Sequence, residues 1–326
     1  MTTLPGTTRV AVIGGGQNCE HDVSLASAAS VAGALDPTAY DVVPLTIGRD
    51  GTWRDRGLRP IGLCGAAQVL RGCDVAFPLV HGPRGEDGAL AALCELAGVP
   101  YVGSGVGAGA IGMDKHATKL AAASLGIRVA SATLLTRAAR DDYAWTGPVV
   151  VKPVDAGSSR GVQLVAHPLA LDAALDDAFA FGDRVLVEEV IVGREIDIAV
   201  LFAPDGPVVS PPLEITSAGF FDYDAKYGAA HETSVRFEVP APLTPTRLAE
   251  LERNALALAR HLGCRGVARF DFFLTADGWV LNEINTVPGF TAHSQVPQMF
   301  AAAGTDYPRL LELLVDAALE RSTVSG

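Results

Sequence analysis

Apolar and polar positions in the first hundred residues form short apolar runs that alternate with longer stretches of helical spacing. Apolar runs occupy residues 9–13, 41–45, 74–80 and 99–102, and helical spacing occupies residues 22–35 and 88–97. Short strands separated by helices are typical of a parallel sheet. We therefore expect an α/β domain over residues 1–112, in which the glycine-rich segment 101–112 is a linker to the rest of the chain.

Beyond residue 112 the strands follow one another more closely. Strands are predicted at residues 149–152, 161–165 and 184–190, with a helix at 168–179. A third section begins near residue 193, with strands at 195–202, 266–274 and 279–283, a helix at 244–262 and a polar loop at 216–232. Long polar loops are typical of lids or mobile segments. The pattern divides residues 113–192 from residues 193–326.

The composition is that of a folded chain with little affinity for polyanions. Of 326 residues, 49% are apolar and 19% are charged, and the formal net charge is −12. A chain of this length forms two or three packed units, and its negative charge disfavours a nucleic-acid or anionic-membrane surface. The five cysteines are scattered without metal-ligand spacing, and no apolar run reaches the length of a membrane span. We expect a cytoplasmic protein that binds neither nucleic acid nor membrane.

Lysine is rare in this chain, with only Lys115, Lys119, Lys152 and Lys226 among 25 basic residues. A compact ammonium binds a single phosphate oxygen in a tight pocket better than a planar guanidinium does. Lys115, Lys152 and Lys226 fall at predicted strand ends or in loops and are predicted to bind phosphate. Lys119 is predicted to lie on a solvated helix face. The alternative is that the four lysines survive by chance.

A predicted hairpin near the C-terminus brings two carboxylates together. If its three-residue loop, residues 276–278, is centred on its middle residue, Asp271 lies directly opposite Glu283. Like charges in that position destabilise a sheet, and Asn285 adds a third oxygen on the same face by the period of two. A divalent cation resolves the repulsion, and open positions for phosphate oxygens favour magnesium. The alternative is that one carboxylate faces solvent or pairs with Arg269.

Two glycine-rich segments are candidates for binding phosphate. Residues 153–161 follow Lys152 and form a small-residue hairpin whose amides can close over phosphates. The order differs from the phosphate loop that precedes a helix, because here the lysine comes first. Residues 14–16 begin like a dinucleotide fingerprint, but Cys19 occupies the place of its last glycine. An oxidoreductase with a nicotinamide cofactor is therefore the weaker hypothesis.

Three further segments carry groups suited to amino-acid chemistry. Asp22 or Ser24 is expected to cap the first long helix, which leaves Glu20 free to hold an ammonium group. His81 follows an apolar strand at the edge where open α/β sheets bind ligands, although a buried structural histidine is equally compatible. The turn at residues 285–291 offers backbone amides to an oxyanion.

Six spaced motifs occur in order along the chain. They are Gly14-Gly15 through Glu20-His21-Asp22, His81-Gly82-Pro83 with Glu86-Asp87-Gly88, Met113-Asp114-Lys115, Val151-Lys152-Pro153 with Gly157-Ser158-Ser159, Phe221-Asp222-Tyr223 with Lys226-Tyr227, and Asn285-Thr286 with Pro288-Gly289. Together they closely resemble the D-alanine–D-alanine ligases of the ATP-grasp superfamily, over residues 10–314. The resemblance implies an ATP-grasp fold, with α+β organisation in its ATP-binding part, preceded by a Rossmann-like α/β domain with a parallel sheet that binds substrate.

The resemblance also implies roles for single residues. For ATP, it implies phosphate contacts by Lys115, Lys152 and Lys226, and adenine or ribose contacts by Glu188, Glu189, Ile191 and Glu195. For Mg²⁺, with Mn²⁺ as an alternative, it implies Asp271, Glu283 and Asn285. For the first amino acid, it implies that Glu20, with His81 beside it, binds the ammonium group and that Ser158 and Tyr227 hydrogen-bond toward Glu20. For the second step, it implies that Arg269 and the Gly289 amide bind the oxyanion. Ser294 and Gln295 are implied to lie near the second substrate.

The implied reaction joins two D-alanines for peptidoglycan precursor synthesis. The first carboxylate takes the γ-phosphate of ATP, and the second amine attacks the resulting acyl phosphate. Gln295 stands where many relatives have an apolar residue, so D-serine or D-lactate stays open as acceptor, while Tyr227 favours an amine, D-alanine before D-serine. A catalytically inactive nucleotide-binding module is the alternative from another class. We expect a homodimer.

Overall fold

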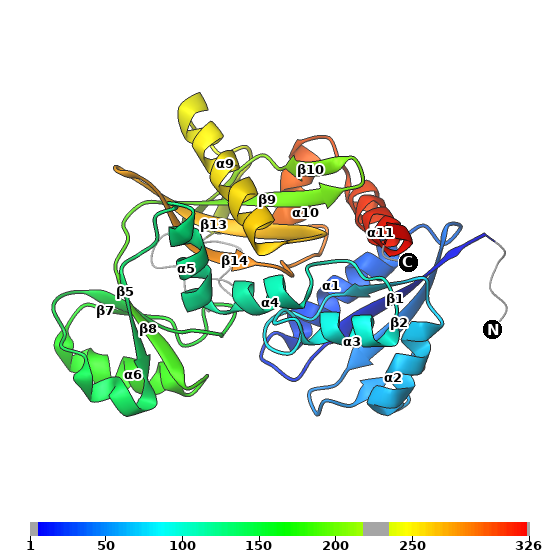
Figure 1. Ribbon diagram of the computed structural model, residues 1–326, viewed down its shortest axis with the longest axis horizontal. Coiled ribbons are helices and arrows are strands. Elements are labelled where there is room, and N and C mark those ends of the chain that lie inside the picture. Colours follow the sequence, from blue (N-terminus) through cyan, green and yellow to red (C-terminus); the bar gives the residue numbers. More distant parts are fainter. Residues whose placement is uncertain (1–5, 218–234, 325–326) are drawn as a thin grey trace.

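The computed structural model describes residues 6–217 and 235–324, which form three sheets with helices packed around them (Figure 1). The N-terminal sheet has the order β3-β2-β1-β4 and consists of β1 (Thr8–Gly15), β2 (Tyr40–Ile47), β3 (Trp53–Arg54) and β4 (Val75–Pro78). Its helices are α1 (His21–Ala34), α2 (Gly62–Arg71) and α3 (Ala89–Ala97). Strands β2, β1 and β4 are parallel, as predicted, and β3 adds an antiparallel edge.

The strand predicted at residues 99–102 is wrong. Within it, only Tyr101 forms a bridge, to Ala76 of β4. The nearby Gly103 has a positive φ of 111°, a conformation that ends an extended segment. The N-terminal sheet therefore ends in a single bridge beyond β4.

The linker predicted at residues 101–112 is also wrong, because it contains the helix α4 (Val106–Met113). Glycine is a poor helix former, but here it permits close packing. A Cβ at Gly109 would lie 2.9 Å from the amide nitrogen of Gly88, and one at Gly112 would lie 2.8 Å from Thr286 Cγ2. The glycine content thus reflects contacts with distant segments and not flexibility.

The central sheet is antiparallel, has the order β5-β8-β6-β7 and packs against α6 (Leu171–Phe179). Its strands are β5 (Ala132–Thr136), β6 (Val149–Pro153), β7 (Gln163–Val165) and β8 (Arg184–Glu189). Along the chain, the helix α5 (Lys115–Ser124) precedes the sheet. The short 3-10 helix η1 (Arg137–Asp142) follows β5, and η2 (Pro168–Ala170) follows β7. The sequence pattern located all of these strands except β5.

The C-terminal sheet has the order β12-β11-β9-β13-β14, with β10 paired to β9. Its strands are β9 (Arg194–Ala203), β10 (Gly206–Val209), β11 (Leu213–Ser217), β12 (Val235–Glu238), β13 (Val267–Thr275) and β14 (Gly278–Asn285). The accompanying helices are α9 (Pro245–Leu262), α10 (Gln295–Ala302) and α11 (Tyr307–Val324). Among the helices described, none combines the length and the apolar character needed to cross a membrane.

The two faces of this sheet have different partners. Residues such as Ile198 and Phe270 pack with α9 and α5 in one core. On the opposite face, Ala199 and Val267 join a core formed by α10, α11 and the N-terminal strands. Further along that face the alternating positions are charged and line a cavity, at Glu195, Asp197, Arg269 and Asp271. The period of two in β9 and β13 thus separates the core from the polar face.

The β13–β14 hairpin differs from its prediction in one detail. Its loop has two residues, 276–277, and not three, because Thr275 pairs with Gly278. Asp271 nevertheless pairs with Glu283, as predicted. A β-bulge between these pairs leaves Asn282 as the extra residue, which restores the predicted register.

Candidate active site

Two cavities meet on the polar face of the C-terminal sheet. The larger cavity, with a volume of about 500 Å³, lies between the central and C-terminal sheets. The smaller cavity, about 260 Å³, lies between the C-terminal sheet and loops of the N-terminal sheet. Both cavities are lined by Lys115, Ala156, Glu195, Ile215 and Glu283. These shared residues form a wall at which ligands in the two cavities would meet.

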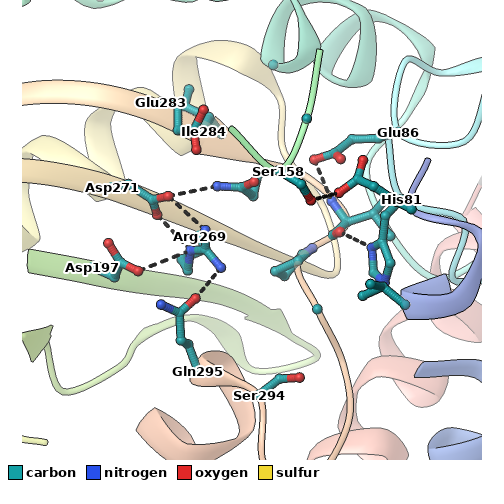
Figure 2. A pocket seen from close by; sticks show the side chains of 18 of the residues that line it. His81, Glu86, Ser158, Asp197, Arg269, Asp271, Glu283, Ile284, Ser294 and Gln295 are labelled. Atoms are coloured by element: carbon teal, nitrogen blue, oxygen red, sulfur yellow. Dashed lines mark hydrogen bonds and ion pairs between the residues drawn. The ribbon is translucent and has the colours of Figure 1, made fainter. Parts of the chain in front are cut away.

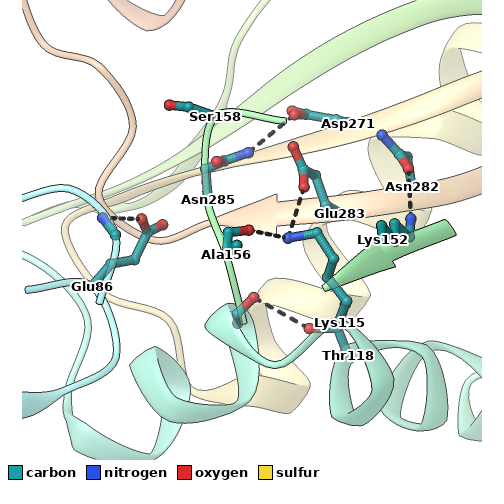
Figure 3. A network of polar contacts seen from close by, with 12 residues as sticks. Glu86, Lys115, Thr118, Lys152, Ala156, Ser158, Asp271, Asn282, Glu283 and Asn285 are labelled. Atoms are coloured by element: carbon teal, nitrogen blue, oxygen red, sulfur yellow. Dashed lines mark hydrogen bonds and ion pairs between the residues drawn. The ribbon is translucent and has the colours of Figure 1, made fainter. Parts of the chain in front are cut away.

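The larger cavity brings together the described residues implied for ATP, namely Lys115, Lys152, Glu188, Glu189, Ile191 and Glu195. Lys152, in β6, has its Nζ 2.9 Å from Glu188 Oε2 and 3.4 Å from Asn282 Oδ1. Lys115 begins helix α5, so the prediction that it lies at a strand end or in a loop is wrong. Its Nζ donates to the Ala156 carbonyl at 2.8 Å and lies 3.3 Å from Glu283 Oε2 (Figure 3).

The prediction that Lys119 faces solvent is wrong. Its side chain is only 6% exposed, and its Nζ lies 3.1 Å from Glu188 Oε1. Since the other oxygen of Glu188 pairs with Lys152, one carboxylate bridges two lysines. Burial, together with the Lys152 charge, lowers the pKa of Lys119 to about 8. Helical spacing did not reveal this position because its partner lies in β8.

The predicted metal ligands lie together in the smaller cavity, and Glu283 among them belongs to the shared wall. Asp271 and Glu283 face each other across the ladder, and Asn285 Nδ2 donates to Asp271 Oδ2 at 3.0 Å. The predicted pairing with Glu283 and the alternative pairing with Arg269 both occur at Asp271. Arg269 donates to the two oxygens of Asp271, from Nε and Nη2 at 2.7 Å each (Figure 2). In the described ranges no three carboxylate, histidine or cysteine side chains converge on one point. Mg²⁺ needs no such trio when phosphate oxygens supply further ligands.

Arg269 is held from several sides. Its Nε lies 3.4 Å from Asp197 Oδ2, and its Nη1 donates to Gln295 Oε1. Burial by itself lowers the pKa of Arg269, but Asp271 and Asp197 outweigh it and raise that pKa well above its usual value. The guanidinium is therefore a permanent, fixed positive charge in the smaller cavity.

Glu20 lines the smaller cavity, and one of its carboxylate oxygens is buried without a partner in the part of the chain that the structure describes. Glu20 is only 7% exposed. Its Oε1 accepts from the Ser158 hydroxyl, in the direction that the resemblance implied, while its Oε2 has no hydrogen-bond partner among the described residues. Gly82 and Gly157 leave just enough space, since a Cβ on either would lie 2.3 Å or 2.4 Å from Oε2. A buried unpaired carboxylate oxygen is costly, so the arrangement suits a cationic ligand.

The capping prediction for the first helix is wrong. Glu20 occupies the N-cap position of α1 and makes no side-chain capping bond. Asp22 pairs instead with Arg49 at 2.8 Å, and Ser24 Oγ accepts from the His81 amide at 3.0 Å. Both side chains hold neighbouring loops in place, which local sequence rules do not anticipate.

His81 lines the smaller cavity and is also bonded within the protein. Its Nδ1 lies 2.7 Å from the Val287 carbonyl, and its Nε2 lies 3.0 Å from Ser27 Oγ. Burial lowers the pKa of His81, which favours the neutral ring. A carbonyl can only accept, so Nδ1 carries the proton and Nε2 accepts from the Ser27 hydroxyl. Both ring nitrogens therefore have protein partners.

Glu86 is a site residue for which sequence reasoning found no role. It accepts from the amides of Thr286 and Val287 at 2.8 Å and 3.2 Å. Burial, together with the Glu20 charge, raises the pKa of Glu86 to about 7. The only available signal was its place in the motif Gly85-Glu86-Asp87-Gly88.

The remaining predicted residues divide between the smaller cavity and the part of the chain without a description. Gly289, Ser294 and Gln295 line the smaller cavity, and Ser294 Oγ accepts from the Thr291 amide at 3.0 Å. Lys226 and Tyr227 lie outside the described residues, as does most of the predicted loop 216–232. The first two residues of that loop belong to β11.

Comparisons with known proteins agree along almost the whole chain. A family model described as "D-ala D-ala ligase N-terminus" matches residues 9–60 and 58–104, and one described as "D-ala D-ala ligase C-terminus" matches residues 126–316. A D-alanine–D-alanine ligase of Streptomyces griseus is 39% identical, with 97% of this chain and 93% of that protein covered.

Solved structures show the same fold. The D-Ala:D-Ser ligase VanG from Enterococcus faecalis superimposes with a TM-score of 0.83 at 32% identity, covering 96% of this chain and 99% of that one. A D-alanine–D-alanine ligase from Bacillus anthracis in complex with ATP has a TM-score of 0.80 at 26% identity, covering 98% and 100%. The predicted combination of a Rossmann-like domain with an ATP-grasp fold is thereby confirmed.

Proposed function

The chain belongs to the D-alanine–D-alanine ligase family, and from this membership and the site we propose that it joins two D-alanines, with ATP converted to ADP and phosphate. The product is the dipeptide used in peptidoglycan precursors, so the enzyme serves cell-wall synthesis and cell shape. The observation that carries the proposal is the wall shared by the two cavities, where Lys115 Nζ lies 3.3 Å from Glu283 Oε2.

The larger cavity suits ATP. Its lysines, Lys115 and Lys152, suit phosphate oxygens, while Glu188, Glu189, Ile191 and Glu195 suit the adenine and ribose. We assign phosphate binding to Lys226 as well, on the family pattern. Residues 113–192 and 193–326 together form the nucleotide-binding part, and residues 1–112 bind the amino acid.

The two facing carboxylates suit a divalent cation. Asp271, Glu283 and Asn285 would hold Mg²⁺, or Mn²⁺, which would neutralise charge on the phosphates. Like charges placed opposite each other in a ladder are unfavourable unless such a charge compensates them. The bond from Arg269 supplies part of that compensation to Asp271.

The residues of the smaller cavity account for both steps. Glu20 Oε2 receives the ammonium of the first D-alanine, while Ser158 holds Glu20 in position. That substrate's carboxylate attacks the γ-phosphate across the shared wall, where Lys115 stabilises the transferred charge. The amine of the second D-alanine then attacks the acyl phosphate, and Arg269 with the Gly289 amide stabilises the oxyanion before phosphate leaves. We assign Tyr227 to the closure that excludes water from the acyl phosphate.

Gln295 is the residue that bears on the acceptor. Arginine can only donate, so Arg269 fixes Gln295 Oε1 toward itself, and the amide N–H groups of Gln295, a residue that lines the smaller cavity, stay available as donors. Such donors suit a hydroxyl-bearing acceptor as well as D-alanine. D-Serine is therefore the second acceptor that we propose, and D-lactate the third.

The decisive experiment identifies the product by mass spectrometry. The protein is incubated with ATP, Mg²⁺ and an equimolar mixture of D-alanine, D-serine and D-lactate. We expect D-alanyl-D-alanine as the main product, with ADP release that requires both the metal and D-alanine. Nucleotide binding without ADP release would identify an inactive binding module instead.

The reaction's use of ATP favours a cytoplasmic location. We also propose that the protein is a homodimer, which analytical sedimentation tests.

A further inference from the structure

The turn from Thr286 to Phe290 is bonded to the N-terminal part of the chain. Its Thr286 and Val287 amides both donate to Glu86 Oε1, at 2.8 Å and 3.2 Å. Its Phe290 amide donates to Ser27 Oγ at 3.2 Å. His81 joins the two contacts, because its Nδ1 donates to the Val287 carbonyl and its Nε2 lies 3.0 Å from Ser27 Oγ.

These N-terminal side chains are buried and hydrogen-bonded. Ser27, His81 and Glu86 are 0%, 4% and 9% exposed. The second oxygen of Glu86 accepts from the Gly82 amide at 3.3 Å. Three backbone amides converge on the side-chain oxygens of Glu86 and hold that side chain in one orientation, which makes the network rigid.

Helix α1 contributes three serines, spaced three residues apart, that hydrogen-bond to this network and to the residues beside it. Ser24 Oγ accepts from the His81 amide, Ser27 Oγ binds the turn, and Ser30 Oγ accepts from the Ala292 amide at 3.2 Å. Residues three apart lie on one face of a helix. Since Glu20 directly precedes α1, the helix connects the ammonium site to the turn.

One amide of the turn is left over. Of residues 286–290, Pro288 has no N–H, and the amides of Thr286, Val287 and Phe290 are engaged. Within residues 6–217 and 235–324, the Gly289 amide has no hydrogen-bond partner, and Gly289 lines the smaller cavity with Arg269. The bonds on either side of Gly289 therefore determine where its N–H points.

We propose that Ser27, His81 and Glu86 form an interdomain latch whose task is to position the Gly289 N–H for the oxyanion of the second step. This rests on the proposed function, because it assigns the latch to peptide-bond formation and not to ATP use. The three are positioning residues, with no direct contact to the reacting atoms. The latch also gives a reason for the buried carboxyl group of Glu86, whose raised pKa shows that its burial lowers the stability of the fold.

The test compares Glu86→Gln and Ser27→Ala with Asp87→Asn. Asp87 is a matched control because it accepts only from amides of its own loop, those of Arg84 and Ala89. Two rates are measured with ATP, Mg²⁺ and D-alanine. One is dipeptide formation. The other is exchange of labelled oxygen between the β,γ-bridge and the non-bridging β positions of ATP, which occurs when the acyl phosphate forms, the P–O bond to ADP breaks, and both reverse.

We expect the latch variants to form dipeptide about tenfold more slowly, a smaller loss than the ~100-fold that follows removal of an oxyanion donor. Isotope exchange should continue at its wild-type rate, so the ratio of exchange to dipeptide formation rises by the same factor. Asp87→Asn should leave both rates unchanged. Thermal unfolding identifies any variant that fails to fold, and Ser27→Ala, which removes a single hydroxyl, then carries the test.

The outcomes separate the two proposals. Equal loss of exchange and dipeptide formation would mean that the latch only stabilises the fold, and unchanged dipeptide formation would mean that it positions nothing; each overturns the inference while the ligase assignment stands. A wild-type protein that forms no dipeptide at all would overturn the proposed function, and the inference with it.

Discussion

Glu283 faces Asp271 because a β-bulge at Asn282 reverses the side-chain alternation of β14. Trp279 and Leu281 point into the core beneath α9, and strict alternation would place Glu283 there as well. The extra residue turns Glu283 to the cavity and lets Asn282 Oδ1 accept from Lys152 Nζ at 3.4 Å. One unpaired residue therefore provides both the carboxylate pair and a contact to a cavity lysine.

The carboxylate pair predicts the effect of Glu283→Gln. Loss of one charge should remove the cation site, so we expect kcat to fall about 100-fold, with the folded state retained. Steady-state assays over a range of Mg²⁺ concentrations, with thermal unfolding alongside, measure both. Asp277→Asn, in the exposed turn of the same hairpin, is the control and should be silent. If Glu283→Gln turned over at the wild-type rate, the assignment of Glu283 as a metal ligand would be wrong.

The narrow space around Glu20 predicts the effect of Gly157→Ala. The added Cβ would lie 2.4 Å from Glu20 Oε2, where we place the first ammonium. We expect KM for D-alanine to rise about tenfold or more while KM for ATP stays the same, since a displacement on the order of 1 Å disrupts productive binding. Gly147→Ala is a matched control, because nothing lies within 4 Å of its added Cβ. Equal changes in both KM values would contradict the assigned role of Glu20.

The raised pKa of Glu86 predicts an unusual pH dependence of stability. Between its ordinary value of 4.5 and about 7, the folded protein keeps a proton that the unfolded chain has released. The unfolding free energy should therefore fall as pH rises through this window, by up to about 3 kcal/mol from this group. Glu20 enhances the shift, and the amides of Val287, Gly82 and Thr286 oppose it.

Urea unfolding of the wild type and Glu86→Gln at several pH values between 4 and 8 checks this. The difference between the two curves should change in favour of the variant as pH rises, because glutamine does not titrate. Parallel curves would show that Glu86 titrates normally and that the amides compensate its burial in full.

The two lysines that share Glu188 predict the effect of Lys119→Met. Glu188 Oε1 would lose its ion-pair partner, and its carboxylate would turn toward Lys152, which we assign to phosphate binding. We expect KM for ATP to rise about tenfold, with little change in KM for D-alanine. Leu120→Met, at an exposed neighbouring position on α5, is the control. Unchanged ATP kinetics would reduce Lys119 to a purely structural residue.

The bond between Arg269 and Gln295 predicts acceptor choice. Gln295→Leu removes the amide donors that we assign to a hydroxyl acceptor, so the preference for D-serine relative to D-alanine should fall about tenfold, expressed as a ratio of kcat/KM values. Competition assays with both acceptors measure it directly. The same ratio in wild type and variant would place acceptor selection elsewhere.

The sequence alone determined the chemistry of this protein and most of its regular elements. Periodicity located strands such as β1, β6 and β13, because alternation and helical spacing are local properties of the chain. The scarcity of lysine pointed to Lys115 and Lys152, which do line the larger cavity. The pairing of Asp271 with Glu283 was predicted correctly, although the loop length assumed for it was wrong.

Only the tertiary structure decided which side chains are buried and what they contact. Lys119 resembles any solvated helical lysine until β8 places Glu188 beside it, and the glycines of α4 resemble a linker until Gly88 and Thr286 pack against them. Glu86 and the Thr286 amide are 200 residues apart in the chain. Burial and long-range hydrogen bonds depend on partners that no local pattern contains, and for that reason the interdomain latch could be found only in the folded protein.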